Sequence, residues 1–234
     1  MKCAGPTIQS ESKPVDHSPW SRLLQNHVSE QGKVDYKGFV KDSLLLNEYL
    51  TTLGNNHPNK KFWSRDEQLA YWINAYNAFT VQLIVRNYPV ESIKDLGGSI
   101  YKINTAWDIK FIKIESEVYD LNNIEHDIIR SNFDEPRIHF AVNCASKSCP
   151  LLMNLAFTAA ELETQLESIA IKFVNSGQND ISPEKAELSR IFKWFNGDFT
   201  EKMTLVEFLN QYSDVKLKAD ADINYKEYDW TLNE

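Results

Sequence analysis

The sequence predicts an α+β fold: a helix-rich single domain with one long buried central helix and a small, mainly antiparallel sheet. Three observations favour this class. Several segments have apolar residues at helical spacing, the strand-like segments are few and scattered, and no internal repeat is present. The 234 residues are 42% hydrophobic and 12% aromatic, which is enough material for a substantial core.

The composition also excludes some classes of protein. The net charge is −8 and no basic stripe stands out, so nucleic acid is not an expected partner. No apolar run approaches the roughly 20 residues that a membrane-spanning helix needs.

The first nineteen residues differ from the rest. Residues 1–19 are polar and rich in Ser and Pro, which predicts a disordered leader before one globular domain over 20–234. Deleting residues 1–17 is therefore expected to leave the melting temperature nearly unchanged. Cys3, followed by small residues and a polar tether, resembles the start of a mature bacterial lipoprotein and is a candidate lipidation site. The alternative is a short cytosolic tail.

The first half of the domain is predicted to be helical. Pro19 suits the first turn of a helix over 18–28, and a second helix over 39–53 ends before a glycine. The central helix has the strongest start signal, because Ser64 and Glu67 form a capping box, and it runs over 65–87.

This central helix is apolar almost all round, which predicts that it is buried. Asn74 and Asn77 lie three residues apart on one of its faces. Buried amides need hydrogen-bond partners, so they either tie the helix to a loop or form part of a pocket wall that binds substrate.

The second half of the chain mixes strands and shorter helices. We expect a β-hairpin over 109–119, a strand over 137–143 and a β-like or irregular tail over 215–232. Helices are expected at four places, two of them starting from capping boxes at Thr158 and Thr204: 123–131, 158–175, 188–195 and from 204 onward.

The segment HFAVNCASKSCP, residues 139–150, is the most informative for function. It resembles a buried strand that ends in a polar loop with two of the three cysteines. Cys144 and Cys149 could form a disulfide, bind zinc together with His126 and His139, or provide a nucleophilic thiol. The zinc alternative matches no common ligand spacing, so no metal and no cofactor are predicted.

The histidines differ in how they could serve a Cys144 nucleophile. In a regular strand His139 lies on the face opposite Cys144, so a direct pair requires a bend at Asn143. His126 is therefore the first choice as proton acceptor. Both histidines could equally be structural: His139 buried and satisfied, His126 at a boundary.

Glu125 is the candidate carboxylate. On a helix its neighbours one turn away are Leu121, Ile128 and Ile129, which turn it toward the core. A buried charge must be paired, hydrogen-bonded or protonated. Glu125 is therefore either a structural brace or a catalytic group, acting as a general base or orienting a histidine.

Six motifs together resemble one protein family. AYWINAYNAFT, YPVESIKDL, LNNIEHDIIR, RIHFAVNCASKSCPLL, LSRIFKWFNGDF and YDWTLN occur in this order in the domain of unknown function 547 family, over about 34–233. In the family pattern the second cysteine can be serine while the first is kept. The resemblance thus implies a special role for Cys144, and it implies a secreted or lipid-anchored protein, which strengthens the interpretation of Cys3.

The combined expectation is a cell-envelope protein, periplasmic or an outer-membrane lipoprotein tethered through Cys3, with a cytoplasmic location as the alternative. It would be a cysteine-dependent hydrolase or acyl transferase on an amide, ester or thiol compound, taking a small-molecule or peptide substrate, with papain-like or transglutaminase-like chemistry. Loop amides and groups such as Ser146, Ser148 and Cys149 would bind substrate. The rival is a non-catalytic binding module with a structural Cys144–Cys149 loop.

Overall fold

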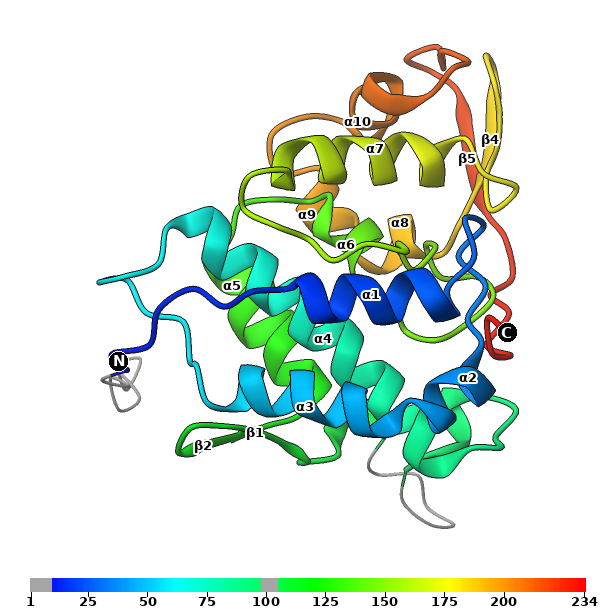
Figure 1. The fold of residues 1–234 in the computed structure, drawn as a ribbon. Coiled ribbons are helices and arrows are strands. Elements are labelled where there is room, and N and C mark those ends of the chain that lie inside the picture. Colours follow the sequence, from blue (N-terminus) through cyan, green and yellow to red (C-terminus); the bar gives the residue numbers. More distant parts are fainter. Residues whose placement is uncertain (1–9, 98–104) are drawn as a thin grey trace.

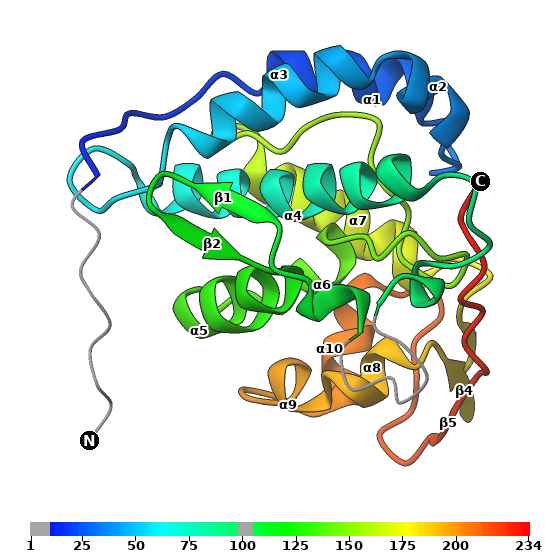
Figure 2. The same ribbon diagram turned by 90° about the horizontal axis from the view of Figure 1, so that it is seen from below.

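The computed structural model describes residues 10–97 and 105–234. A long helix, α4 (Arg65–Asn87), lies in the middle of the molecule, with the N-terminal helices on one side and the second half of the chain on the other (Figures 1 and 2). The N-terminal helices are α1 (Ser18–His27), α2 (Tyr36–Lys41) and α3 (Ser43–Gly54).

Helix α4 has the start, the length and the burial that its sequence predicts. Ser64 Oγ accepts a hydrogen bond from the Glu67 amide at 3.2 Å, and Glu67 Oε2 accepts one from the Ser64 amide at 2.6 Å. Every residue over 69–84 is buried. A helix that is apolar on all sides must be covered on all sides, so α4 is the axis of the core.

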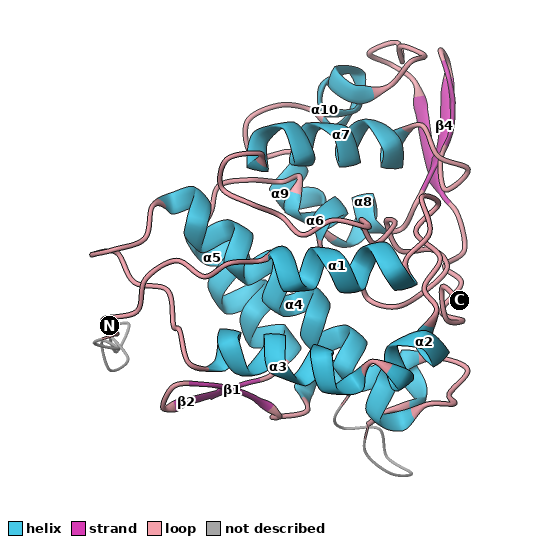
Figure 3. Ribbon diagram, viewed as in Figure 1, coloured by secondary structure: helices cyan, strands magenta, loops and turns pink. Residues whose placement is uncertain are grey.

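Within the described residues, two small sheets complete the fold, and Figure 3 draws their strands in magenta. Strands β1 (Ile112–Ile114) and β2 (Glu117–Tyr119) form the expected antiparallel hairpin. In the other sheet β4 (Lys185–Leu188) pairs antiparallel with β3 (Asp180–Ser182) and parallel with β5 (Asp222–Tyr225). The α+β class with a mainly antiparallel sheet is confirmed.

The second half also contains a π-helix, η3, and six short to medium α-helices. These are η3 (Asn123–Ile129), α5 (Arg130–Asn132), α6 (Ile138–Ala141), α7 (Leu162–Val174), α8 (Ile191–Trp194), α9 (Asn196–Phe199) and α10 (Leu205–Tyr212). No helix within residues 10–97 and 105–234 is both long and apolar enough to cross a membrane.

The strand expected over 137–143 is wrong, because this segment forms helix α6. The amides of Ile138 and His139 donate to the carbonyls of Glu135 and Pro136, which closes a helical turn. A short apolar run has no periodicity that separates a buried strand from a buried helical turn.

Three helix boundaries also differ from expectation. The segment 39–53 is two helices that meet at Asp42. The capping box at Thr158 does not form, because its amide donates to the Gln165 side chain and α7 begins later, at Leu162. The segment 188–195 is helical only in α8, since Leu188 ends strand β4.

The expectation of a disordered leader up to residue 19 is wrong for residues 10–17. Ser10 Oγ donates to Glu115 at 2.6 Å, and the Trp63 indole donates to the Ser12 carbonyl at 3.0 Å. His17 is buried, with Nδ1 2.8 Å from the Tyr49 hydroxyl. A polar segment can be held by such contacts without any periodic pattern. Cys3 lies outside the described residues.

Candidate functional site

A pocket of about 200 Å³ brings together most of the residues predicted to carry chemistry. Its wall includes Glu125, His126, His139, Cys144 and Cys149. They come from η3, from α6 and from the loop after α6, so the core of the second half of the chain positions them. Much of the remaining wall is aromatic, with Tyr76, Trp107, Trp194, Phe195, Tyr228 and Trp230.

The two cysteines of the pocket are joined in a disulfide. The Ser146 and Tyr228 hydroxyls each lie 3.3 Å from Cys144 Sγ, and the Tyr228 hydroxyl donates to Cys149 Sγ at 3.4 Å. Burial raises the pKa of Tyr228 to about 12, so its hydroxyl keeps its proton at neutral pH. Because Ser146 Oγ donates to the Tyr228 hydroxyl at 3.2 Å, the single Tyr228 proton is the one placed to donate to sulfur.

The C-terminal segment holds the loop between the cysteines. The Lys147 amide donates to the Thr231 carbonyl at 2.8 Å and the Ser148 amide to the Asp229 carbonyl at 3.2 Å. The Ala145 amide donates to Asn143 Oδ1 at 2.8 Å. These amides are satisfied within the protein, so they cannot also form the oxyanion site expected in this loop without breaking a bond.

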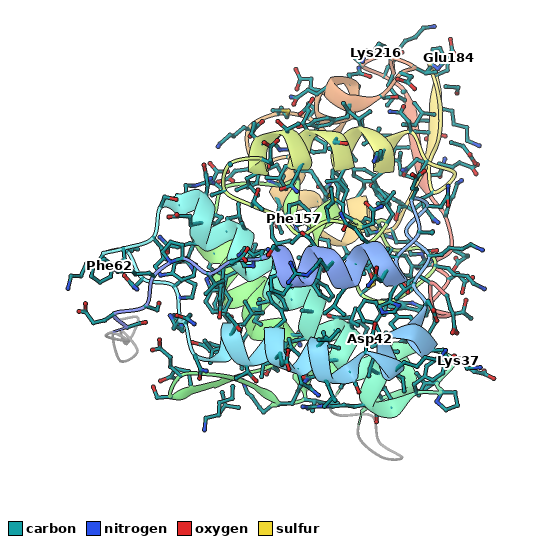
Figure 4. The ribbon with its side chains drawn as sticks, viewed as in Figure 1. Lys37, Asp42, Phe62, Phe157, Glu184 and Lys216 are labelled. Atoms are coloured by element: carbon teal, nitrogen blue, oxygen red, sulfur yellow. A yellow bond between two sulfur atoms is a disulfide. The ribbon has the colours of Figure 1, made fainter. Side chains whose placement is uncertain are left out.

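The predicted substrate-binding residues other than Cys149 lie behind the pocket wall. Ser148 Oγ accepts from the Asp229 amide at 2.9 Å, and Ser146 is 1% exposed. Asn74 exchanges two hydrogen bonds with the backbone of Phe157, at 2.8 and 2.9 Å. Phe157 is buried and lies near the centre of the view in Figure 4, while Lys37, Glu184 and Lys216 lie at the outline of the molecule.

Asn77 connects α4 to the start of the loop that contains Cys144 and Cys149. It donates to the Ala141 carbonyl at 2.9 Å and accepts from the Asn143 amide at 2.8 Å. Both groups flank the point where α6 ends and the cysteine loop begins. Asn77 therefore fixes the start of the cysteine loop against the central helix, and Asn74 fixes the later segment at Phe157.

His139 has the geometry of an oriented base. Its Nε2 lies 2.7 Å from Asp198 Oδ2, and its ring stacks on Phe195 with centroids 3.9 Å apart. Hydrogen bonds from His139 and Arg130 hold the pKa of Asp198 well below its usual range, whereas burial lowers the pKa of His139. Asp198 is therefore ionised and accepts the Nε2 proton of a neutral imidazole.

The other ring nitrogen of His139 is unsatisfied. Nδ1 is buried and has no hydrogen-bond partner among the described residues. In the neutral tautomer that Asp198 selects, Nδ1 carries a lone pair and can accept a proton. Sequence reasoning missed Asp198, although it stands in the LSRIFKWFNGDF motif.

His126 is hydrogen-bonded to Arg130 rather than to a carboxylate. Its Nδ1 lies 2.9 Å from Arg130 Nη1, and because a guanidinium can only donate, Nδ1 is the acceptor and the ring proton is on Nε2. Arg130 also binds Asp198 through Nε and Nη2, at 2.7 and 2.8 Å. In the disulfide form neither histidine is hydrogen-bonded to Cys144 Sγ within the described part of the chain.

Glu125 is buried as predicted, with 7% of its surface exposed. It orients neither histidine, because His139 is held by Asp198 and His126 by Arg130. Its charge contributes to raising the pKa values of the buried hydroxyls of Tyr76 and Tyr228, after the larger effect of burial. No salt bridge within residues 10–97 and 105–234 includes Glu125.

The zinc alternative has no support in the geometry. Within the described ranges, no group of three or more His, Cys, Asp or Glu residues is arranged so that it could hold a metal ion.

Fold and pocket together define a helix-rich α+β protein whose cavity combines a cysteine pair, two histidines and a buried carboxylate. The chain belongs to the family described as Protein of unknown function, DUF547, whose model matches residues 60–174. The match includes four of the six motifs and is shorter than the expected 34–233, since the motifs at 188–199 and 228–233 lie outside it. No curated protein and no solved structure matches the chain.

Proposed function

We propose that this protein is a cysteine-dependent hydrolase or acyl transferase that acts on an amide, ester or thiol compound, with Cys144 as its nucleophile in the dithiol form. The observation that carries the proposal is that His139, which is held by Asp198, lines the same pocket as Cys144. A carboxylate holds one imidazole nitrogen and leaves the other free, which is the arrangement of an activated base.

The chemistry requires that the disulfide first be opened. An external dithiol supplies two electrons and two protons, which leaves thiols on Cys144 and Cys149 and oxidises the reductant to its own disulfide. His139 Nδ1 then takes the Cys144 proton, Sγ attacks the substrate carbonyl, and the imidazolium returns the proton to the leaving group. Water or a second acceptor completes the transfer from the thioester.

The hydroxyls of Tyr228 and Ser146 fit this scheme. Both lie 3.3 Å from Cys144 Sγ, and Ser146 donates to the Tyr228 hydroxyl. Once the disulfide is open, the Tyr228 proton can turn from Cys149 to a Cys144 thiolate, which favours the ionised thiol. Because loop amides 145, 147 and 148 are already bonded, we assign thiolate stabilisation to the Tyr228 hydroxyl. We further propose an envelope location with Cys3 as lipid anchor. Mutation of Cys3→Ser in the natural full-length gene should release the protein from the membrane fraction, and an unchanged distribution would refute the anchor.

The second candidate is a binding module in which the cysteine loop is purely structural. It is favoured by the hydrogen bonds that pin this loop to the C-terminal segment. In that case the thiols formed on reduction would have ordinary reactivity.

Thiol alkylation separates the two candidates. Two variants, Cys149→Ser and Cys144→Ser, each leave one pocket thiol, and each serves as the matched control of the other. We expect iodoacetamide at pH 7 to label Cys144 about tenfold faster than Cys149. In the Cys149→Ser background, His139→Gln should abolish the difference. Equal rates, or a Cys144 rate independent of His139, would favour the binding module.

A further inference from the structure

Among the described residues that line the pocket, Glu125 is the one acidic group, and the proposed chemistry assigns it no role. It is 7% exposed, it lines the pocket, and no salt bridge of the described residues reaches it. Arg130, a neighbouring guanidinium, is taken by Asp198 through two hydrogen bonds. The neutral Tyr76 hydroxyl interacts with this carboxylate, but no cationic side chain of the described residues forms an ion pair with it. A buried carboxylate that has no counter-charge favours a cation from outside.

The rest of the wall suits an organic cation. No lysine or arginine is among the described residues that line the pocket. Three rings lie against one another, with centroids 4.6 Å apart for Tyr228 and Trp230, 4.8 Å for Trp194 and Tyr228, and 5.8 Å for Trp194 and Trp230. Aromatic rings attract ammonium groups through their negative faces, most strongly where water is excluded.

The same aromatic cluster already holds one ammonium group. Lys94 Nζ lies over the Trp230 ring, 5.0 Å from its centroid, and Lys94 is not part of the pocket wall. Trp194 is 45% exposed, which leaves apolar surface of the cluster open to a ligand. The cavity of about 200 Å³ is smaller than the roughly 300 Å³ at which pockets for drug-sized ligands begin. It fits a short alkylammonium chain better than a large planar molecule.

We propose that the pocket recognises its substrate through an alkylammonium group, which lies beside Glu125 and against the cluster of Trp194, Tyr228 and Trp230. The inference rests on the proposed function, because the same cavity contains Cys144, and it names the class of substrate. An acyl compound that carries an amine would place its carbonyl near the cysteine and its cation near Glu125.

Small probes test the inference on the whole protein. The probes are n-butylammonium, n-butanol and butyrate, which share a chain length and differ in charge, and binding is followed by calorimetry and by the fluorescence of the pocket tryptophans. We expect n-butylammonium to bind about tenfold or more tightly than n-butanol, and butyrate to be excluded. Equal affinity of the amine and the alcohol for the parent protein would overturn the inference without any variant.

Two variants assign the effect to residues. Glu125→Gln keeps the shape and removes the charge, so n-butylammonium should lose its advantage over n-butanol. Glu48→Gln, an exposed change on α3, is the control and should retain it. Trp194→Ala should weaken n-butylammonium about threefold or more. Because this ring also packs on Tyr228 and Trp230, the melting temperature of the variant is measured as well, to show that it is folded. A Glu125→Gln variant that keeps the preference would refute the role of this carboxylate.

Different results would overturn the alkylammonium site and the proposed enzyme function. The probe experiment needs no free thiol and is run on the disulfide form and on a Cys144→Ser, Cys149→Ser double variant. Preferential binding of the cation with an inert Cys144 would overturn the enzyme proposal alone. A Cys144 of high reactivity with no preference for the cation would overturn the alkylammonium site alone.

Discussion

Acid should unfold this protein through His17, and the size of the effect follows from its burial. His17 lies with Nδ1 2.8 Å from the Tyr49 hydroxyl, and burial lowers its pKa to about 4, from 6.5. Between about pH 4 and pH 6.5, the His17 imidazole is therefore protonated in the unfolded chain and neutral in the folded chain. The contribution of neutral His17 to the free energy of unfolding is fully present above about pH 6.5, and it is lost as the pH falls toward 4. At about 1.4 kcal/mol per pKa unit, the loss from His17 is about 3 kcal/mol.

The measurement is the free energy of unfolding from urea titrations at pH 7, 6, 5 and 4. His139 and His57 also have pKa values lowered by burial, so the parent protein reports a sum. Comparison with His17→Gln isolates the contribution of His17. Between pH 6 and 4, the free energy of unfolding of this variant should fall by about 1 kcal/mol less per pH unit than that of the parent protein. Lys13→Gln, an exposed change in the same segment, should follow the parent. Identical slopes for His17→Gln and the parent would refute the reasoning.

Three further predictions concern stability. Deleting residues 1–17 should lower the free energy of unfolding by about 2 kcal/mol, because Trp63 and Tyr49 lose hydrogen-bond partners, and an unchanged urea midpoint would contradict the placement of residues 10–17. Asn77→Ala should cost about 2 kcal/mol by leaving a buried carbonyl and a buried amide unpaired, whereas the exposed Asn55→Ala should cost almost nothing. Glu125→Gln should change the free energy of unfolding of the ligand-free protein by less than about 1 kcal/mol, because the neutral amide keeps the shape and can still accept from the Tyr76 hydroxyl; a larger loss would show that the fold requires the charge.

The central helix could be predicted from sequence because independent signals agreed. The Ser64–Glu67 capping box set its start, Pro89 set its end, and the apolar run between them required burial. The turn around Ile138 was missed for the opposite reason. Its apolar run is too short to have a period, and its helical conformation depends on the carbonyls of Glu135 and Pro136, which no apolar pattern records.

The sequence was enough to predict which residues form the candidate site, but not which of them contact one another. Cys144, His139 and Glu125 were singled out by residue type and lie in one pocket. Their partners come from far along the chain: Asp198 lies 59 residues after His139, and Tyr228 lies 84 residues after Cys144. Such contacts depend on how the elements pack, and local spacing in a single sequence contains no information about them.

The two carboxylates beside the histidines show how packing gives similar groups different tasks. Asp198 receives hydrogen bonds from His139 and Arg130, and these bonds keep it charged and fixed. Arg130 and His139 already pair with the Asp198 carboxylate. Asp198 can therefore orient the imidazole but is not free to bind a ligand. Glu125 lines the pocket, which Asp198 does not, and it interacts with the neutral Tyr76 hydroxyl but forms no ion pair with a described residue. In the proposed dithiol form, a Cys144 thiol that shares the pocket with an oriented histidine, together with a carboxylate that lacks a counter-charge, favours a substrate with a carbonyl at one end and an amine at the other.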